Sequence, residues 1–335
     1  MISDSADHAA YRELGPDQVL DAVDASGFLS DGRLLALNSY ENRVYQVGLD
    51  EGEPVVAKFY RPGRWSDEAI LEEHQLTLTL ADAGLPVVPP LVLDGARTLV
   101  RAGNFRLALY ARRGGRAPEL DNLDNLEILG RFMARMHALG EASAFQHRPT
   151  LTVEGFGDEA RDLILSGDWL PGDLREAYER ASADALVRVR EAYRRAGEVR
   201  YLRLHGDAHP GNILWRDDLP HFVDFDDSRM GPAVQDLWMF LSGDREDRSV
   251  QLDALLEGYT QFREFDAAEL NLVEALRTLR IMHHAAWIAR RWDDPAFPLA
   301  FPHFGDLHYW EEHILALKEQ MAAMDEAPLR WGFNS

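Results

Sequence analysis

The feature that most restricts the fold of this chain is the spacing of oxygen-bearing side chains in two neighbouring segments. LHGDAHPGNILW (204–215) places Asp207 and Asn212 five positions apart, and VDFDD (223–227) follows after a short apolar strand. Carboxylate and amide oxygens are the ligands that hard divalent cations such as Mg²⁺ prefer. The two segments therefore predict a cation site, and the His-Gly pair before Asp207 indicates that another group is positioned beside it.

Composition narrows the classes of partner. The chain has 335 residues and a formal net charge of −22, which argues against nucleic acid as a partner because nucleic-acid binders concentrate Lys and Arg. It has no cysteine, so disulfides, thiolate zinc sites and thiol nucleophiles are excluded. The N-terminus lacks the signature of a secretory signal, and no apolar run of about 18 residues predicts a membrane span. We expect a cytoplasmic monomer that binds neither nucleic acid nor membrane.

Strand-like runs bounded by turn residues dominate the chain as far as residue 110. A helix with Ser66 as its N-cap is predicted at 66–84, and a shorter one at 15–28. The predicted strands cover 33–39, 43–49, 53–60, 86–93, 97–103 and 105–111. This part of the chain is therefore expected to be an antiparallel sheet carrying one main helix.

Helical spacing of apolar residues dominates after the Gly- and Arg-rich stretch 112–116. The predicted helices lie near 126–140, 173–197, 230–243, 248–265, 267–291 and 308–325. The predicted fold class is α+β, with the bilobal order of protein-kinase-like folds. We expect a small antiparallel-sheet lobe at 1–110 and a larger, mainly helical lobe at 111–335.

The loop that contains Asp207 has the spacing of a phosphoryl-transfer loop. His205-Gly206-Asp207 with Asn212 matches the H-R-D-x-x-x-x-N loop of protein kinases, with Gly in place of Arg. In this interpretation Asp207 is the catalytic base for an acceptor hydroxyl, and Asn212 is a Mg²⁺ ligand. Asp224 is the second ligand, at the place where kinases carry D-F-G. The alternative is a simple turn followed by a solvated acidic loop, and the combined spacing favours the catalytic interpretation.

A lysine for the phosphates of ATP is expected on a strand of the first lobe. Lys58 in VVAKFY resembles the V-A-I-K strand of kinases, although an edge-strand lysine that faces water would look similar. Its partner acid is expected on the helix at 66–84. Glu73 shares a face with apolar residues of that helix and is predicted to point inward, whereas Glu72 is expected to face solvent.

The phosphate clamp departs from the Gly-rich loop of kinases. LALNSYENRVYQV (35–47) contains no glycine, so Asn38, Ser39 and Asn42 are the residues that would replace it. A serine hydroxyl and backbone N–H groups donate to phosphate oxygens, and asparagine tolerates tight turns. Ser39 and Asn42 are therefore predicted to bind ATP, the alternative being an ordinary hairpin turn.

Two further residues are predicted to support the loop. Asp236 stands where a helix is expected to start, and it either caps that helix or accepts backbone N–H groups of the loop around Asp207. His205 is expected to be structural, because Mg²⁺ prefers oxygen ligands to imidazole.

These stretches together resemble the aminoglycoside/choline phosphotransferase superfamily, which shares the protein-kinase fold. More narrowly, the chain resembles the bacterial stress response kinase A family of serine/threonine protein kinases. The stretches that carry the resemblance extend from residue 37 to about 298 and are LNSYENRVYQV, KFYRPGRW, ILEEHQ, LHGDAHPGNILWRD, GPAVQDLWM and RRWDDPAFP. LNSYENRVYQ and RRWDDPAFP are the two that narrow it to this family.

The resemblance implies ATP- and Mg²⁺-dependent phosphorylation of Ser or Thr in proteins, as part of a response to stress. It implies that 1–110 binds ATP and that 111–335 contains the catalytic and acceptor-binding parts, with 276–310 near the acceptor. The first alternative is a small-molecule kinase of the same fold that acts on an amino alcohol, a homoserine-type or an aminoglycoside-type acceptor. The second is a non-catalytic ATP-binding module, against which the intact Lys58, Asp207, Asn212 and Asp224 argue.

Overall fold

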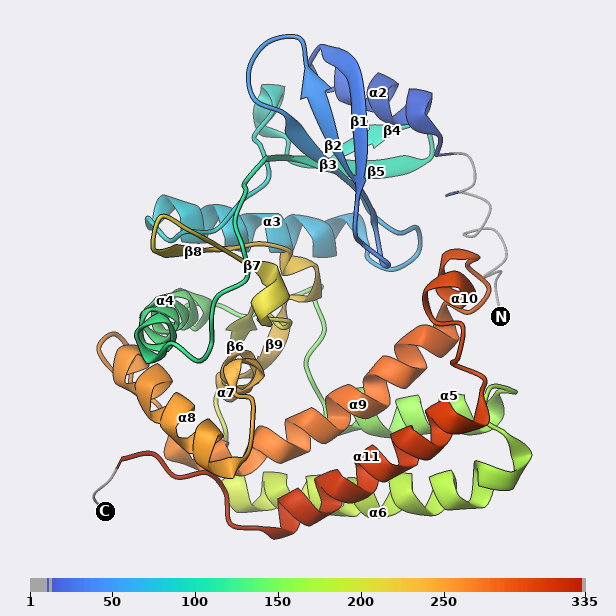
Figure 1. Cartoon of the computed structure of the whole chain (residues 1–335). Coiled ribbons are helices and arrows are strands. Elements are labelled where there is room, and N and C mark those ends of the chain that lie inside the picture. The colour runs from blue at the N-terminus through green and yellow to red at the C-terminus, as the bar shows by residue number, and fades with distance from the viewer. Residues whose placement is uncertain (1–10, 12–13, 333–335) are drawn as a thin grey trace. The chain divides into compact units, whose positions relative to one another are not determined.

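The computed structural model describes Tyr11 and residues 14–332, which form two compact units (Figure 1). Among the described residues, the first unit combines those up to Pro118 with the segments 145–148 and 209–228, and the others form the second. Both units are therefore discontinuous in the sequence, and the chain passes from the second unit to the first between Ala208 and His209. The assignment of an ATP-binding lobe at 1–110 and a catalytic lobe at 111–335 stays a prediction.

The α+β class is confirmed by the sheet of the first unit. The sheet is antiparallel throughout, and its strands in spatial order are β1 (Ser30–Leu37), β2 (Arg43–Leu49), β3 (Val55–Phe59), β5 (Phe105–Ala111) and β4 (Val100–Ala102). Lys58 lies on the central strand β3, opposite Val44 of β2 and Ala108 of β5. Its backbone position is therefore fixed from both sides of the strand.

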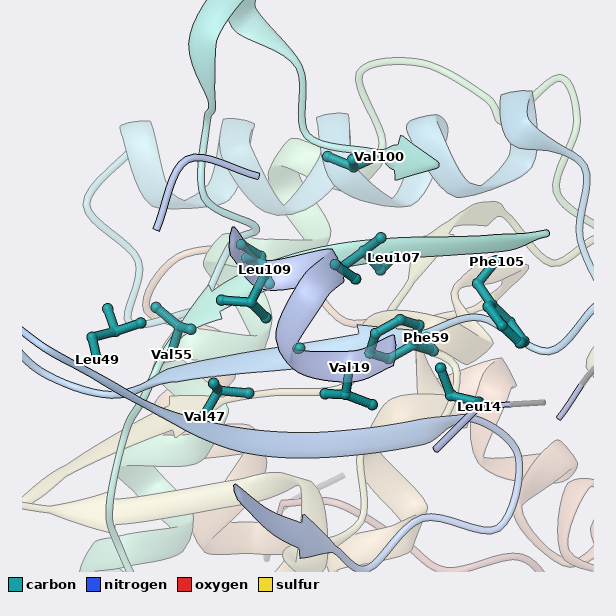
Figure 2. Packing of buried hydrophobic residues seen from close by; sticks show 13 residues of the cluster. Leu14, Val19, Val47, Leu49, Val55, Phe59, Val100, Phe105, Leu107 and Leu109 are labelled. Carbon is teal, nitrogen blue, oxygen red and sulfur yellow. The ribbon is translucent and has the colours of Figure 1, made fainter. Parts of the chain in front are cut away.

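One face of this sheet packs against α2 (Pro16–Asp24) around an apolar core. Figure 2 shows Val19 of α2 among side chains of several strands, including Val47, Phe59 and Leu107, and all four are fully buried. Burial of an apolar side chain of this size stabilises the fold by about 1.5–3 kcal/mol. The core therefore fixes the central strands, including β3, which carries Lys58.

The expected strand at 86–93 is wrong. The segment forms only isolated bridges, in which Val87 pairs with Phe222, Pro90 with Tyr110 and Leu93 with Arg97. Three of its residues are prolines, which have no N–H to donate to a sheet ladder, so a continuous strand cannot form.

Helix α3 (Asp67–Asp82) begins as expected at Ser66, whose Oγ accepts the N–H of Ala69 at 3.2 Å. Its buried face contains Ile70, Leu76 and Leu80 together with the polar residues Glu73, His74 and Thr77. A helix that buries charged and polar side chains needs partners for them. This face therefore contributes both to the packing and to the site.

The apolar stretch after Asn212 is a hairpin rather than one strand. β7 (Ile213–Arg216) pairs with β8 (Leu219–Phe222), and the two residues between them, Asp217 and Asp218, have φ values of 52° and 60°. Positive φ at both central residues is the signature of a type I′ hairpin turn, which aspartate tolerates. The hairpin returns the chain, so Asn212 and Val223 lie side by side, and Val223 N–H donates to the Asn212 carbonyl at 3.0 Å.

The second unit is mainly helical (Figure 1). Its helices are α4 (Leu123–Gly140), α5 (Glu159–Ser166), α6 (Arg175–Ala196), α7 (Val234–Leu237), α8 (Arg245–Tyr259), α9 (Val273–Arg290), α10 (Ala296–Ala300) and α11 (Leu307–Asp325). Helices α4 and α8 cross closely, since a Cβ at Gly130 would lie 1.9 Å from the Leu255 carbonyl oxygen. No helix among the described residues is long and apolar enough to span a membrane.

The helix expected at 230–243 is wrong, whereas an α-helix lies in each of the other ranges predicted after residue 112. Two of these ranges are longer than their helices, because α8 ends at Tyr259 and the segment before α9 is a 3₁₀ helix (Ala267–Leu272). Residues 229–232 form strand β9 (Arg229–Pro232), which pairs antiparallel with β6 (Tyr201–Leu204). Gly231 and Pro232 disfavour a helix here, so only the short α7 and a 3₁₀ turn follow. The pairing holds β6 in place immediately before His205.

Candidate active site

The first unit contains a cavity of about 350 Å³, a volume typical of ligand sites. Apolar side chains from the strands and the hairpin line it, among them Val44, Val56, Val88 and Leu214. The polar side chains that line it are Asn38, Ser39, Lys58, Glu73, Thr77, Tyr110, Arg113, Asn212 and Asp224. The structure therefore brings Ser39, Lys58, Glu73, Asn212 and Asp224 to one cavity, as the sequence predicts.

Lys58 is buried and forms two ion pairs within the first unit. Its Nζ lies 3.0 Å from Asp224 Oδ1 and 3.3 Å from Asp226 Oδ1. Burial alone lowers the pKa of a lysine, but the two carboxylates hold the pKa of Lys58 well above its usual value. Lys58 therefore remains a cation inside the cavity, where it suits a polyanionic ligand.

Glu73 points inward as predicted, but its ion pair is with Arg148 rather than with Lys58. Glu73 Oε2 lies 3.1 Å from Arg148 Nη2, and both side chains are almost fully buried. Burial raises the pKa of Glu73 to about 7, against the lowering effect of Lys58 and Arg148. Arg148 also donates to the carbonyls of Ala69 and Asp226, at 3.0 and 2.7 Å. The Arg148 guanidinium has no access to water and needs a negatively charged partner inside the protein. It therefore pairs with the Glu73 carboxylate, which we expected beside Lys58.

Glu72 differs from its expected solvent-facing role. Its carboxylate accepts the backbone N–H groups of Gln146, His147 and Arg148, at 2.6, 2.8 and 3.0 Å. These bonds fix the segment 145–148 on α3. They therefore hold Arg148 where it bonds to Glu73.

Asp224 has an uncommon backbone conformation for a residue other than glycine. Its φ of 58° and ψ of 64° are left-handed, and such conformations concentrate at functional sites. Asn212 lies at the end of a 3₁₀ turn, where its N–H donates to the His209 carbonyl at 2.9 Å. The two side chains line the same cavity.

These two residues fit a Mg²⁺ ion better than they fit a transition metal. No group of three or more His, Cys, Asp or Glu that would hold a metal occurs among the described residues. Mg²⁺ is commonly held by one or two protein oxygens together with substrate phosphates and water. Asn212 and Asp224, beside a lysine in a cavity, provide this kind of donor set.

Asp207 lies in the second unit, in a loop held by Asp236. The buried Asp236 carboxylate accepts the N–H groups of His205 and Gly206 at 2.8 and 2.9 Å. Gly206 has a φ of 85°, which favours glycine at this position. His205 Nδ1 accepts the Asp207 N–H at 3.3 Å. These are the contacts expected of supporting residues, and the catalytic role of Asp207 stays a prediction.

Comparison with known proteins gives a consistent result. Residues 33–273 match the phosphotransferase enzyme family. Stress response kinase A of Escherichia coli strain K12 is 43% identical over 320 residues, which cover 96% of each chain. The serine/threonine protein kinase RdoA of Salmonella typhimurium strain LT2 is 41% identical over the same length and coverage. The chain belongs to the stress response kinase A family of phosphotransferases.

Solved structures with the same fold include more distant kinases. Amicoumacin kinase in complex with AMP-PNP and Ca²⁺ has a TM-score of 0.71 at 20% identity, with 96% of each chain covered. A microcompartment-associated aminopropanol kinase has a TM-score of 0.69 at 18% identity, covering 92% of this chain and 96% of that one. Like these proteins, the family member described here has the α+β kinase-like fold.

Asp226 is a further residue of the candidate site, and the motif spacing does not indicate it. Asp226 is buried, and its Oδ2 accepts hydrogen bonds from Asn42 Nδ2 at 3.1 Å and from the Arg64 guanidinium. Although burial raises its pKa, Arg64, Lys58 and Arg148 lower the pKa of Asp226 to about 2. One signal for Asp226 was present in the sequence. Arg64, the cation that pairs with Asp226, lies in KFYRPGRW, one of the stretches that carry the family resemblance.

Asn42 takes a different position from the cradle residue that we expected. It is buried, it does not line the cavity, and its Oδ1 accepts the Arg61 N–H at 3.1 Å. Its own N–H donates to Ser39 Oγ at 3.3 Å. Asn42 therefore connects the turn that contains Ser39 to Asp226, whereas Asn38 and Ser39 line the cavity.

The stability of the second unit is expected to depend on pH through Glu269. Its Oε2 accepts the Val234 N–H at 2.8 Å, and burial raises the pKa of Glu269 to about 7. The folded state therefore binds a proton that the unfolded chain, with an ordinary pKa of 4.5, has released. The free energy of unfolding should fall by about 3 kcal/mol as the pH rises from the unfolded to the folded pKa, and change little above that.

Urea unfolding of the Glu269→Gln variant across this pH range checks the expectation. The variant should lose the share of the decline that comes from Glu269, about 3 kcal/mol, because a glutamine still accepts the bond from Val234 but carries no charge. The share from Glu73, whose pKa burial also raises to about 7, should remain. Glu257→Gln, at an exposed position on α8, is the control and should keep the decline. An unchanged decline in Glu269→Gln would contradict this origin.

Proposed function

We propose that this chain is an ATP- and Mg²⁺-dependent serine/threonine protein kinase that acts in the cytoplasm in a bacterial response to stress. The observation that carries the proposal is the cavity in which the Lys58–Asp224 ion pair lies with Asn212 and Ser39. The names of the relatives at 41–43% identity support a protein acceptor and a stress response. The expected monomeric state stays a prediction.

The cavity suits a nucleoside triphosphate. Its apolar wall of Val44, Val56, Val88 and Leu214 suits an adenine ring. Lys58 supplies a fixed positive charge for the phosphates, and the Ser39 hydroxyl supplies a donor. Asn212 and Asp224 would hold Mg²⁺, which when bound neutralises negative charge on the phosphates.

The transfer step requires a base for the acceptor hydroxyl. Asp207 would accept the hydroxyl proton while the hydroxyl oxygen forms a bond to the γ-phosphorus. The bond from that phosphorus to the β–γ bridging oxygen breaks, and its electron pair leaves with ADP. Asp236 and His205 would keep Asp207 in position through the backbone bonds of the loop.

Nucleotide binding tests the first half of the proposal. Lys58→Met should weaken ATP binding by about tenfold to a hundredfold, because a charge-assisted bond contributes about 1.5–3 kcal/mol. Lys318, exposed on α11, provides the matched control, and Lys318→Met should bind ATP as the wild type does. Calorimetric titration of ATP with Mg²⁺ measures both. Equal affinity in the two variants would contradict the placement of ATP in this cavity.

The metal ligands are tested by the Mg²⁺ dependence of the same titration. Asp224→Asn and Asn212→Ala should each raise the Mg²⁺ concentration needed for half-maximal ATP binding. Asp218→Asn, at the tip of the β7–β8 hairpin, is the control and should leave that concentration unchanged. Variants at 212 and 224 with the wild-type dependence would contradict their role as ligands.

A small-molecule kinase of the same fold remains the second candidate. Its support is that structures named as amicoumacin kinase and aminopropanol kinase share the fold. The relatives named as protein kinase or stress response kinase are about twice as similar in sequence, which favours the protein acceptor. A non-catalytic ATP-binding module is disfavoured, because the residues needed for transfer are all present.

A further inference from the structure

The proposed base Asp207 has a cationic neighbour in its own unit. Asp207 Oδ1 lies 2.6 Å from Nη1 of Arg280, which projects from the middle of α9. The Arg280 side chain is 43% exposed and that of Asp207 is 21% exposed. Both groups are therefore accessible to an incoming molecule, and the pair is not a sealed structural contact.

The helix that carries Arg280 is cationic in a chain that is strongly acidic. The net charge is −22, yet α9 carries one acid, Glu274, against the three arginines Arg277, Arg280 and Arg290. Burial lowers the pKa of His284, so this histidine adds no positive charge. Glu274 is itself bound by Arg248, whose Nη1 lies 2.7 Å away. An ammonium group at Asp207 would meet the positive charge of Arg280, which disfavours amino alcohols and aminoglycosides as acceptors.

Arg280 also binds the Asp207 oxygen Oδ1, which the acceptor hydroxyl must reach. A general base needs its oxygen within about 2.6–3.2 Å of the hydroxyl it deprotonates. A negatively charged group on the acceptor would give Arg280 an alternative partner and leave Asp207 Oδ1 to the hydroxyl. Guanidinium groups bind carboxylates through two parallel hydrogen bonds, so the exchange has a suitable geometry.

We propose that Arg280 is a specificity-determining residue that binds a carboxylate next to the acceptor hydroxyl. The preferred acceptors are then Ser or Thr residues with Asp or Glu one or two positions away, since consecutive Cα atoms are about 3.8 Å apart. This inference rests on the proposed function and names the class of peptide that the kinase prefers.

The test compares three peptides that differ only at the position after the acceptor serine, which holds Asp, Asn or Lys. The full-length chain with Mg²⁺ and ATP should phosphorylate the Asp peptide with a kcat/KM about tenfold to a hundredfold above that of the Asn peptide. The Lys peptide should be the poorest acceptor. Arg280→Gln should remove the preference, and Arg280→Glu should shift it towards the Lys peptide.

Arg277→Gln is the matched control, because it removes the same charge about one turn of α9 before Arg280. The Arg277 guanidinium packs on Trp238, with its Cζ 5.2 Å from the centroid of the ring. It should keep the wild-type ratio of Asp to Asn peptide. The ratio within one variant is unaffected by a loss of folded protein, so a merely structural role of Arg280 would not change it. Arg280→Lys should retain part of the preference, since it keeps the charge but loses the two parallel bonds.

The outcomes separate this inference from the proposed function. Equal rates on the three peptides would overturn the role of Arg280 and leave the kinase proposal standing. Failure of the wild type to phosphorylate any peptide or protein would overturn both. Glycerate and glycerol serve as a small-molecule pair that differs in one carboxylate. Transfer to glycerate alone, with no peptide phosphorylated, would contradict the claim that the carboxylate bound by Arg280 belongs to a peptide.

Discussion

Replacing Asp207 with asparagine is expected to lower the rate of phosphoryl transfer by about 10²- to 10⁴-fold, the usual contribution of a positioned general base. Asparagine has the same shape as aspartate and keeps a side-chain oxygen, but its amide cannot accept the hydroxyl proton. ATP binding should be unchanged, since the residues of the cavity belong to the first unit and Asp207 belongs to the second. Single-turnover transfer and ATP titration measure the two quantities separately.

Asp168→Asn provides the control for this substitution, because Asp168 is an exposed aspartate of the same unit. It should transfer phosphate at the wild-type rate. If Asp207→Asn transferred phosphate at the wild-type rate, another residue would have to be the general base. A variant that loses ATP binding and transfer together would contradict the division of roles between the cavity and the loop.

Replacing Asp226 with asparagine is expected to cost about 3–5 kcal/mol of unfolding free energy, as does breaking other buried ion pairs. The Asp226 carboxylate faces Lys58 at 3.3 Å and also bonds to Asn42 and Arg64. Removing its charge leaves the buried Arg64 and Lys58 with less compensation, while the volume of the side chain is kept. Urea unfolding of the purified variant, which reports the free energy directly, measures the loss.

Asp227→Asn is the matched control, since Asp227 is the next residue and also bonds to Arg64, at 2.9 Å. Its side chain is 33% exposed, so its loss should cost no more than about 1 kcal/mol. Equal losses at 226 and 227 would contradict the central place given to Asp226.

Acid provides an independent check on Asp226. The pKa of about 2 in the folded state lies below its ordinary value of 3.8. The stability from its ionised form is therefore complete above the ordinary value and is lost as the pH falls through the folded one. Asp226→Asn should remove this part of the acid-induced loss of stability.

The residues of the site that could be predicted are those whose spacing along the chain carries the chemistry. Motif spacing predicts Asn212 and Asp224, the apolar strand VVAKFY predicts Lys58, and the structure places all three around one cavity. The inward face of α3 followed from helical periodicity, which placed Glu73 correctly.

The remaining contacts depend on segments that are distant in the sequence. Arg148 lies 75 positions from Glu73, so nothing local indicates that it takes the carboxylate expected for Lys58. The aspartates 224, 226 and 227 are chemically identical, and the path of the 3₁₀ turn decides that Asp226 is the buried one. The ion pair between Asp207 and Arg280 likewise depends on how α9 packs against the loop that contains Asp207.

The measurement that tests the central claim most directly is transfer of labelled phosphate from ATP with Mg²⁺, in the wild type and in Asp207→Ala. The acceptors are generic proteins and a panel of small alcohols and amino alcohols. The account predicts label on Ser and Thr of protein, lost in Asp207→Ala. Label on a small alcohol alone, or protein label that survives in Asp207→Ala, would contradict it.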